Sequence, residues 1–340
     1  MRRVAAVLLA INMAAVPGTA QQPPSLAPVE PLPAPFELWL AAVRAEAATR
    51  GIRPEILEQA FAGVEPVEQI LERDRAQAEF TLDLSAYLKR RLTRKTIKTA
   101  QEMYSHHRAL LTRIGKQYGV SPRIVVAVWG LESNFGRFAG VRPTIPTLTT
   151  LAYDERRGAM FRNELFSALE ILNRGDIELD RLKGSWAGAL GQPQFMPSSY
   201  LQYAEDFDGD GHRDIWTSEA DVFASVANYL KQHGWAKGDG WGREVKLPGK
   251  VQARAAAIPV RETGCRAERA MTDPRPLSAW RQMGVRTMTG ALVPSSAVEA
   301  SLVLAGSRSF LLYPNYDSIL GYNCAHTYAL SVALLSDRLH

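Results

Sequence analysis

The chain has 340 residues, a formal net charge of +5 and 46% hydrophobic residues. A hydrophobic fraction of this size in a chain of this length is enough to bury a large core, which excludes a disordered protein. The positive charge favours a polyanionic partner such as nucleic acid, a membrane surface or the acidic peptides of a cell wall. Because the sequence has no basic and aromatic nucleic-acid motif, we expect no nucleic-acid partner.

The first twenty residues have the pattern of an export signal. A basic pair begins the segment, an apolar run covers residues 4–16, and the small residues Gly18 and Ala20 suit a cleavage site. The run is shorter than the roughly 20 residues of a membrane helix, and no cysteine follows it to accept a lipid anchor. We expect residues 1–20 to be removed and the mature protein to be periplasmic, with no membrane span. An uncleaved anchor helix is the alternative.

Residues 21–35 contain six prolines and predict an extended linker, followed by one domain over residues 36–340. Within this domain the apolar residues recur mainly with a helical period. The pattern predicts helices over residues 36–50, 54–61, 73–92, 95–118 (closed by Gly119), 163–173, 219–233 and 327–339. Two short runs, 244–247 and 301–305, are β-like. The fold class expected is mainly α (α+β), with a small β element.

Glu132 lies on an apolar stripe of a further helix, which begins at Ser121 and Pro122. Val125, Trp129 and Glu132 are spaced i, i+4 and i+7, so they share one helical face. Burial and the negative end of the helix dipole both raise the pKa of a carboxyl group. We therefore expect Glu132 to stay protonated near neutral pH, as a general acid requires. A glutamate paired with a buried arginine is the alternative.

A run of aspartates predicts a calcium loop. Asp206, Asp208, Asp210, Gly211 and His212 form the opening half of an EF-hand, with oxygen ligands at alternate positions and a glycine at the bend. His212 would contribute its backbone carbonyl. The glutamate usual at position twelve is absent, and an Asp/Gly turn without metal is the alternative.

The only two cysteines, Cys265 and Cys324, are expected either to pair in an oxidising compartment or to remain free.

Several sequence stretches resemble one enzyme family. GLESNFGRFAG, residues 130–140, resembles the E-S-x-x-G motif of lysozyme-like lytic transglycosylases. GSWAGALGQPQFMPSSYLQYAEDFDGDGH, residues 184–212, is similar to the lytic murein transglycosylase B family, as are SVANYLKQHGW at 225–235 and GYNCAHTYA at 321–329. The resemblance implies a lysozyme-like helical catalytic core at about residues 105–240, with added helical segments and a calcium-type loop over 206–221.

The resemblance also implies a reaction. Glu132 would be the single catalytic acid and base of a lyase that cuts peptidoglycan strands. It would protonate the glycosidic oxygen between N-acetylmuramic acid and N-acetylglucosamine, then accept the proton of the muramyl 6-hydroxyl as a 1,6-anhydro ring closes. The chemistry would need no cofactor, because one carboxylate suffices where hydrolytic glycosidases usually need two. The expected partners are peptidoglycan strands and other cell-wall enzymes.

The family motifs place substrate-binding groups at seven further positions. These positions are Ser185, Gln194, Tyr229, Tyr322, Asn323, Tyr328 and, by the weakest match, Tyr87. Hydroxyl and amide groups bond sugar oxygens, and tyrosine rings cover apolar sugar faces. Core packing is the alternative for each tyrosine. Gln192 and Pro193 depart from the aromatic and glycine common in relatives, which puts the shape of this subsite in doubt.

The resemblance completes the calcium loop and sets the competing functions. Relatives close a similar loop with a late aspartate, so Asp221 is the expected final ligand of a structural Ca²⁺. The first alternative function is a hydrolytic muramidase, which would leave reducing muramic acid ends. The second is a non-catalytic peptidoglycan-binding protein. A calcium sensor is less favoured because one incomplete loop lacks the pairing that sensors use.

Overall fold

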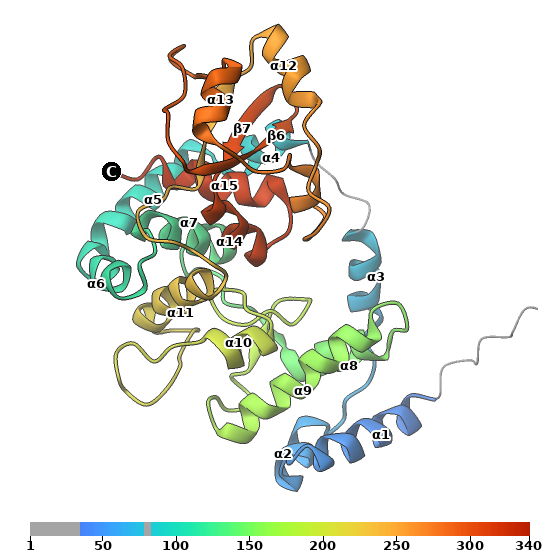
Figure 1. The fold of residues 1–340 in the computed structure, drawn as a ribbon. Helices are drawn as coiled ribbons and strands as arrows, with labels where there is room; N and C mark the ends of the chain where they lie inside the picture. The colour runs from blue at the N-terminus through green and yellow to red at the C-terminus, as the bar shows by residue number, and fades with distance from the viewer. Residues whose placement is uncertain (1–34, 78–82) are drawn as a thin grey trace, which may run out of the picture. The chain divides into compact units, whose positions relative to one another are not determined.

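A computed structural model describes residues 35–77 and 83–340 (Figure 1). The predicted signal peptide and all of the predicted linker except Pro35 lie outside the described residues. In the described part of the chain, fifteen α-helices accompany two small sheets. None of the helices described is both long enough and apolar enough to cross a membrane. The predicted fold class, mainly α with a small β element, is confirmed.

The N-terminal helices are more broken than their apolar pattern predicts. Their bounds are α1 (Phe36–Thr49), α2 (Pro54–Ala60), α3 (Glu68–Gln77), α4 (Leu84–Arg91), α5 (Arg94–His106) and α6 (Arg108–Tyr118). The single helices predicted over 73–92 and 95–118 are wrong. Asp83 is an extended N-cap whose carboxylate accepts from the Ala86 amide, which starts α4 afresh. His107 separates α5 from α6 and is buried against the rings of Trp129 and Phe223.

Helix α7 (Pro122–Ser133) is buried on every side. Residues 124–131 are all buried, so the predicted apolar stripe covers in fact the whole circumference. This is the pattern of a helix inside a core rather than on a surface. Helices α5, α6, α11 (Glu219–Gln232) and α15 (His326–Ser336) all pack against α7. The packing of these four helices fixes the position of Glu132, the penultimate residue of α7.

A second helical group follows α7 in the chain. It contains α8 (Thr144–Tyr153), α9 (Gly158–Arg174) and α10 (Pro197–Tyr203). Helices α8 and α9 lie side by side, and α2 and α3 pack against α9 and α8 respectively (Figure 1). Strands β1 (Arg142–Pro143) and β2 (Lys183–Gly184) form an antiparallel pair that ties the segment before α8 to the loop after α9.

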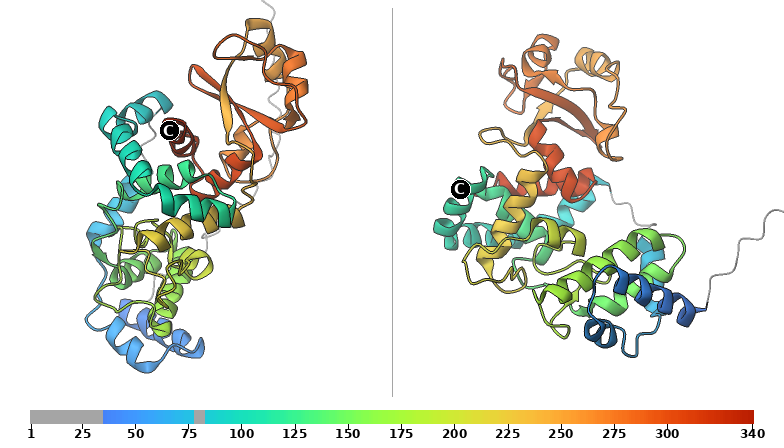
Figure 2. Two further views of the ribbon diagram at one scale, coloured as in Figure 1. Left: turned by 90° about the vertical axis from the view of Figure 1, so that its left-hand side faces the viewer. Right: turned by 60° about the horizontal axis from the view of Figure 1, so that its bottom comes forward.

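A five-stranded antiparallel sheet is inserted between α11 and the last two helices (Figure 2). Its strand order is β4-β6-β7-β3-β5, with β3 (Gly242–Lys246), β4 (Arg275–Pro276), β5 (Arg286–Thr287), β6 (Glu299–Ala305) and β7 (Arg308–Leu312). Helices α12 (Gly249–Ala256) and α13 (Leu277–Met283) belong to this insert, which has its own hydrophobic cluster around Trp280, Leu302 and Leu311. Helix α14 (Pro314–Tyr322) then returns the chain to the main core, where it packs on α11 and α15.

Candidate active site

The chain reverses direction directly after Glu132. Asn134 and Phe135 both have left-handed backbone conformations, with φ of 52° and 59°. This turn folds the Phe135 ring back onto α7 over Gly130, where a Cβ atom would lie 2.4 Å from the ring. Ser133 closes the turn, since its hydroxyl accepts from the Gly136 amide at 3.0 Å. Gly130 and Ser133 of the GLESNFG motif therefore shape the turn that leaves Glu132 at the end of a buried helix.

The carboxyl group of Glu132 is partly buried and has an unusual pKa. Burial is the largest influence and raises the pKa to about 7, while the Tyr328 hydroxyl and the Arg91 charge both lower it. The prediction of a raised pKa thus agrees with the structure. Glu132 lines a cavity of about 300 Å³ together with Arg90, Arg91 and Phe138. No second carboxylate is among the described residues that line this cavity.

Tyrosines from three helices lie next to one another beside Glu132. The ring centroids of Tyr229 (α11) and Tyr322 (α14) are 4.7 Å apart, and those of Tyr322 and Tyr328 (α15) are 6.5 Å apart. The Glu132 charge acts on the pKa of both Tyr322 and Tyr328, which burial raises well above its usual range. The structure therefore brings together three of the tyrosines predicted for the site, and Tyr87 also acts electrostatically on Tyr328.

The hydroxyl groups of these tyrosines have different partners. Tyr229 donates to the carbonyl of Gly321 at 2.6 Å, and Tyr322 donates to the carbonyl of Pro193 at 2.7 Å. The Tyr328 hydroxyl is buried and has no hydrogen-bond partner of good geometry among the described residues. An unsatisfied buried hydroxyl is costly, so this O–H group is available to donate to the Glu132 carboxylate or to a bound ligand.

The loop over residues 184–195 is joined to both α7 and α14. Gln192 accepts from the indole N–H of Trp129 at 2.6 Å and donates to the carbonyl of Trp216 at 2.8 Å. Gln192, whose departure from the family pattern put the subsite in doubt, is thus a buried anchor of the loop. The carbonyl of Pro193 receives the Tyr322 hydroxyl. Gln194 follows with a left-handed φ of 54°, and its side-chain amide donates to the Gly191 carbonyl.

Ser185 and Asn323 differ in how firmly they are held. The Ser185 hydroxyl accepts from the amides of Ala187 and Ala189, at 3.3 and 3.1 Å, and so closes its own turn. No contact between Ser185 and Glu132 is found in the described part of the chain. Asn323 is exposed and follows α14 directly. Its neighbour Cys324 forms a disulfide with Cys265, which resolves the open question about the two cysteines and links this segment to the sheet insert.

The sequence does not reveal that Arg91 and Gln192 hydrogen-bond to α7, the helix that carries Glu132. Arg91 donates to the backbone carbonyl of Leu131, next to Glu132, across 40 positions of sequence. Its only signal in the sequence is a place in the basic run of residues 89–91, which resembles an ordinary solvated helix end. Gln192 stands out in the sequence only as a departure from the family pattern. Both act through partners distant in the chain, which spacing does not reveal.

The carboxylates of three predicted calcium ligands converge. One oxygen from each of Asp206, Asp208 and Asp210 lies within 4.8 Å of the others, a spacing that suits a shared cation. Asp206 also accepts from the Gly209 amide at 2.7 Å, which curls the loop. His212 is exposed, and its amide donates to the Asp210 carboxylate at 2.8 Å.

Asp221 lies outside this cluster of three acids. It is fully buried at the start of α11, and its two oxygens accept from the amides of Phe207 and Asp214 at 2.8 and 2.9 Å. Burial raises the pKa of Asp221 to about 6. Asp221 therefore holds the two ends of the acidic loop together through the backbone. Its role as a metal ligand stays a prediction.

Comparisons with known proteins agree with this architecture. The family model for the Transglycosylase SLT domain matches residues 35–337. The membrane-bound lytic murein transglycosylase B of Escherichia coli K12 is 32% identical over 252 residues. The aligned region covers 72% of this chain and 64% of that protein, so more than a third of the relative's length is unmatched.

Solved structures give the same grouping. SltB3 from Pseudomonas aeruginosa, in complex with NAG-anhNAM-pentapeptide, is 40% identical with a TM-score of 0.80, covering 89% of this chain and 78% of that chain. SltB1 from the same organism is 30% identical with a TM-score of 0.74, covering 88% and 97%. Slt35 from Escherichia coli, in complex with calcium, is 27% identical with a TM-score of 0.73, covering 88% and 91%. The chain therefore belongs to the lytic transglycosylase family defined by the Transglycosylase SLT domain, as its motifs predict.

Proposed function

We propose that this protein is a peptidoglycan lytic transglycosylase in which Glu132 is the single acid and base. The observation that carries the proposal is a partly buried carboxyl group with a pKa of about 7 at the family's motif position. A group with this pKa holds a proton near neutral pH and still releases it readily, as one residue acting in both steps requires. The lack of a second carboxylate in the described lining of its cavity favours this scheme over two-carboxylate hydrolysis.

The proposed reaction has two proton transfers and no net change in Glu132. In the first step Glu132 gives its proton to the glycosidic oxygen as the bond from that oxygen to C1 of N-acetylmuramic acid breaks. The oxygen of the substrate's own N-acetyl group stabilises the developing positive charge. In the second step the muramyl 6-hydroxyl attacks C1 and returns its proton to Glu132, which closes the 1,6-anhydro ring. Water is not consumed.

The neighbouring groups fit the binding of a sugar chain. The half-buried ring of Tyr322 can cover an apolar sugar face, and the buried ring of Tyr328 packs nearly parallel to it at 17°. Gln194 and Ser185 would offer an amide and a hydroxyl to the acetamido and hydroxyl oxygens, and Asn323 is exposed for the same purpose. The bound NAG-anhNAM-pentapeptide of SltB3 supports a peptidoglycan fragment as the ligand class.

Mass analysis of muropeptides released from purified cell wall tests this proposal. The wild-type protein should release fragments with anhydromuramyl ends, and Glu132→Gln should release none above background. Glu155→Gln is the matched control, because it makes the same chemical change at an exposed acid outside the site. Reducing muramic acid ends would identify a hydrolytic muramidase instead. Normal wall binding without any released fragment would identify a non-catalytic binding protein.

We further propose a structural calcium ion in the loop over residues 206–221. Three converging carboxylates and the backbone carbonyl of His212 supply the hard oxygen ligands that Ca²⁺ prefers. The calcium complex of the similar protein Slt35 supports this choice of ion. The ion would offset the repulsion among the aspartates and hold the start of α11, which carries Tyr229. It takes no part in either proton transfer.

We also propose that the protein is exported to the periplasm. The proposal is supported by the basic, apolar and small-residue pattern of residues 1–20 and by the NAG-anhNAM-pentapeptide bound to the similar protein SltB3. Fractionation of cells that produce the full chain should recover it in the periplasmic fraction, with an N-terminus near Gln21. Recovery of an uncleaved chain in the membrane fraction would contradict the proposal.

A further inference from the structure

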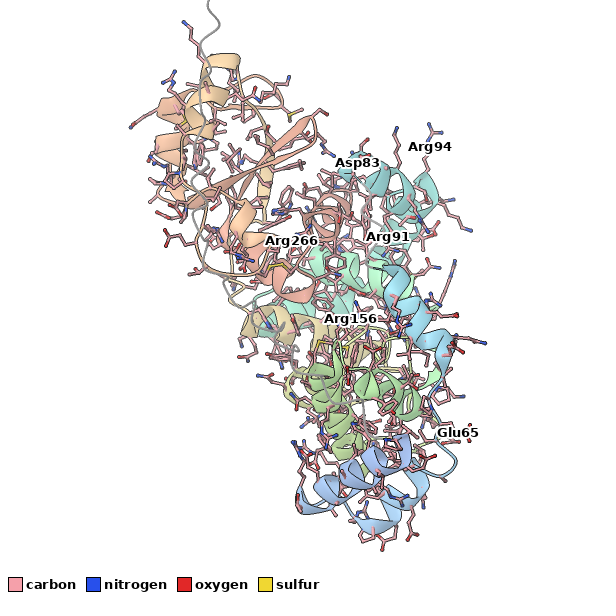
Figure 3. The ribbon with its side chains drawn as sticks, turned by 90° about the vertical axis from the view of Figure 1, so that its right-hand side faces the viewer. Glu65, Asp83, Arg91, Arg94, Arg156 and Arg266 are labelled. Atoms are coloured by element: carbon pink, nitrogen blue, oxygen red, sulfur yellow. A yellow bond between two sulfur atoms is a disulfide. The ribbon has the colours of Figure 1, made fainter. Side chains whose placement is uncertain are left out.

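Arg91 is the last residue of α4 and comes within reach of the end of α7. In the view of Figure 3, Arg91 is labelled between Arg94 above it and Arg156 below it. Helix α4 packs on α15, and α15 packs on α7. Helix α4, which carries Arg91, is therefore joined through α15 to the helix that carries Glu132, and α15 itself carries Tyr328.

The contacts of Arg91 differ from those of an ordinary surface arginine. Its Nη2 donates to the carbonyl of Leu131, in the last turn of α7 and next to Glu132 in the chain. The carbonyls of a helix's last turn have no partner within the helix, so an arginine at this point satisfies a group that α7 itself leaves open. The side chain is partly buried, and its Nε is buried without a hydrogen-bond partner among the described residues.

The positive charge of Arg91 also acts on the Glu132 carboxyl. Both residues line the cavity of about 300 Å³, with Arg90 as the other cation in its lining. Two side chains act on the pKa of Glu132, Arg91 of α4 and Tyr328 of α15, and the Glu132 charge in turn acts on Tyr322 of α14. Among these, Arg91 is the one that carries a full positive charge.

We propose that Arg91 is a positioning residue for the reaction: it fixes the last turn of α7 and presents a positive charge to the Glu132 carboxylate. This inference rests on the proposed function of Glu132 as sole acid and base. Burial alone favours the protonated acid and opposes the ionised form that must exist between the two proton transfers. A fixed cation on the cavity wall stabilises that ionised form. Arg91 therefore balances the acid role of Glu132 against its base role.

Two substitutions separate the charge of Arg91 from its hydrogen bond. Arg91→Met removes both, whereas Arg91→Lys keeps the charge and loses the planar donor group that reaches Leu131. Lys89→Met is the matched control, because it removes one positive charge from the same helix at an exposed position outside the cavity. Thermal unfolding of each variant shows whether it is folded.

The decisive readout is the pKa of Glu132, followed by ¹³C NMR in labelled protein and assigned by the signal missing in Glu132→Gln. We expect Arg91→Met to raise the pKa by about one unit, while Arg91→Lys and Lys89→Met leave it close to that of the wild type. Because this titration needs no substrate, it stands even if the proposed function fails. Product analysis tests that function separately.

The rate of anhydromuropeptide release gives a second readout. For Arg91→Met we expect kcat to fall about tenfold or more with a smaller change in KM, and the alkaline limb of the pH profile to move upward with the pKa. Arg91→Lys should recover part of kcat. An unshifted pKa and an unshifted pH profile in a folded Arg91→Met protein would overturn the proposal. Equal shifts in Lys89→Met would overturn it too, by showing only a general effect of net charge.

Discussion

At the scale of single residues, the site depends on how Glu132 is held between opposing influences. Burial raises its pKa from 4.5 to about 7, and the Tyr328 hydroxyl and Arg91 limit that rise. A fully desolvated carboxyl group would protonate a leaving oxygen, but its burial would strongly disfavour the ionised form that must then accept the second proton. The position at the end of α7, rather than in its middle, is what lets two outside groups reach the carboxyl.

Glu132 should lower the stability of the folded protein as the pH rises. The folded protein holds this proton up to about pH 7, whereas the unfolded chain releases it near pH 4.5. The native state therefore binds more protons in this window, and the free energy of unfolding falls as the pH rises from 4.5 to 7. We expect Glu132→Gln to be more stable than the wild type by up to about 3 kcal/mol at pH 8, with little difference at pH 4. Urea unfolding at both pH values measures this.

The control for this prediction is the exposed acid Glu155. The substitution Glu155→Gln should change the free energy of unfolding by less than about 0.5 kcal/mol at either pH. If Glu132→Gln were equally or less stable than the wild type at pH 8, the carboxyl would not be destabilised by burial. Its assignment as the proton donor would then lose its physical basis.

At the scale of elements, the turn after α7 is built around a missing side chain. The Phe135 ring lies over Gly130, so a Cβ atom there would be only 2.4 Å from Cε1 of the ring. We expect Gly130→Ala to lower the free energy of unfolding by about 1–3 kcal/mol, as other overpacked cores do. It should also lower kcat, because the turn that presents Glu132 must shift. Urea unfolding and anhydromuropeptide release measure the two effects.

A compensating substitution tests the cause of this effect. Adding Phe135→Leu to Gly130→Ala removes the ring and should restore part of the stability. A Gly130→Ala protein as stable and as active as the wild type would contradict the role given to the close approach. Helix propensity alone favours alanine over glycine by about 1 kcal/mol, so a loss of stability is a strict test.

The disulfide is the second element-scale device. Cys265 and Cys324 are 59 positions apart, and the bond ties the segment between α14 and α15 to the sheet insert. Replacing both cysteines with serine should lower the free energy of unfolding by about 2–4 kcal/mol. Because Tyr322 and Asn323 directly precede Cys324, we expect KM to rise more than kcat falls. Reduction of the wild type with dithiothreitol should reproduce both changes. An unchanged KM would mean that this segment does not contact the glycan.

The elements also show what the sequence predicts well. Helices with a strong period and clear ends, such as α1, α2 and α11, were predicted within a few residues. The long helix predicted over 95–118 was wrong because an apolar period continues across His107, and only tertiary packing marks the break there. Helix α8 was missed, since eight of its ten residues are threonine, leucine, isoleucine or alanine and most are buried, which leaves no contrast to reveal a period.

At the scale of the whole molecule, the site draws on parts of the chain that the sequence keeps far apart. Glu132 and the tyrosines were found because their motifs are local and resemble a known family. The contacts of Arg91 with Leu131 and of Gln192 with Trp129 were not, since each spans dozens of residues and exists only after folding. The sequence therefore identifies the groups that are proposed to carry the chemistry. The groups that hold them in place come from the packing of α4, α7 and the loop before α10.

Calcium should act on the whole molecule through the start of α11. The cluster of Asp206, Asp208 and Asp210 binds an ion only when the loop is folded, so binding must stabilise the native state. We expect Ca²⁺ at about 100 times its Kd to raise the free energy of unfolding by about 2.7 kcal/mol, and EGTA to reverse this. Asp208→Asn should weaken the response, whereas Asp180→Asn, at an exposed acid outside the cluster, should leave it intact.

At temperatures where the calcium-free protein stays folded, kcat should change little, because the ion takes no part in the proposed proton transfers. An unfolding temperature that is the same in Ca²⁺ and in EGTA would show that the aspartates form a turn without a metal.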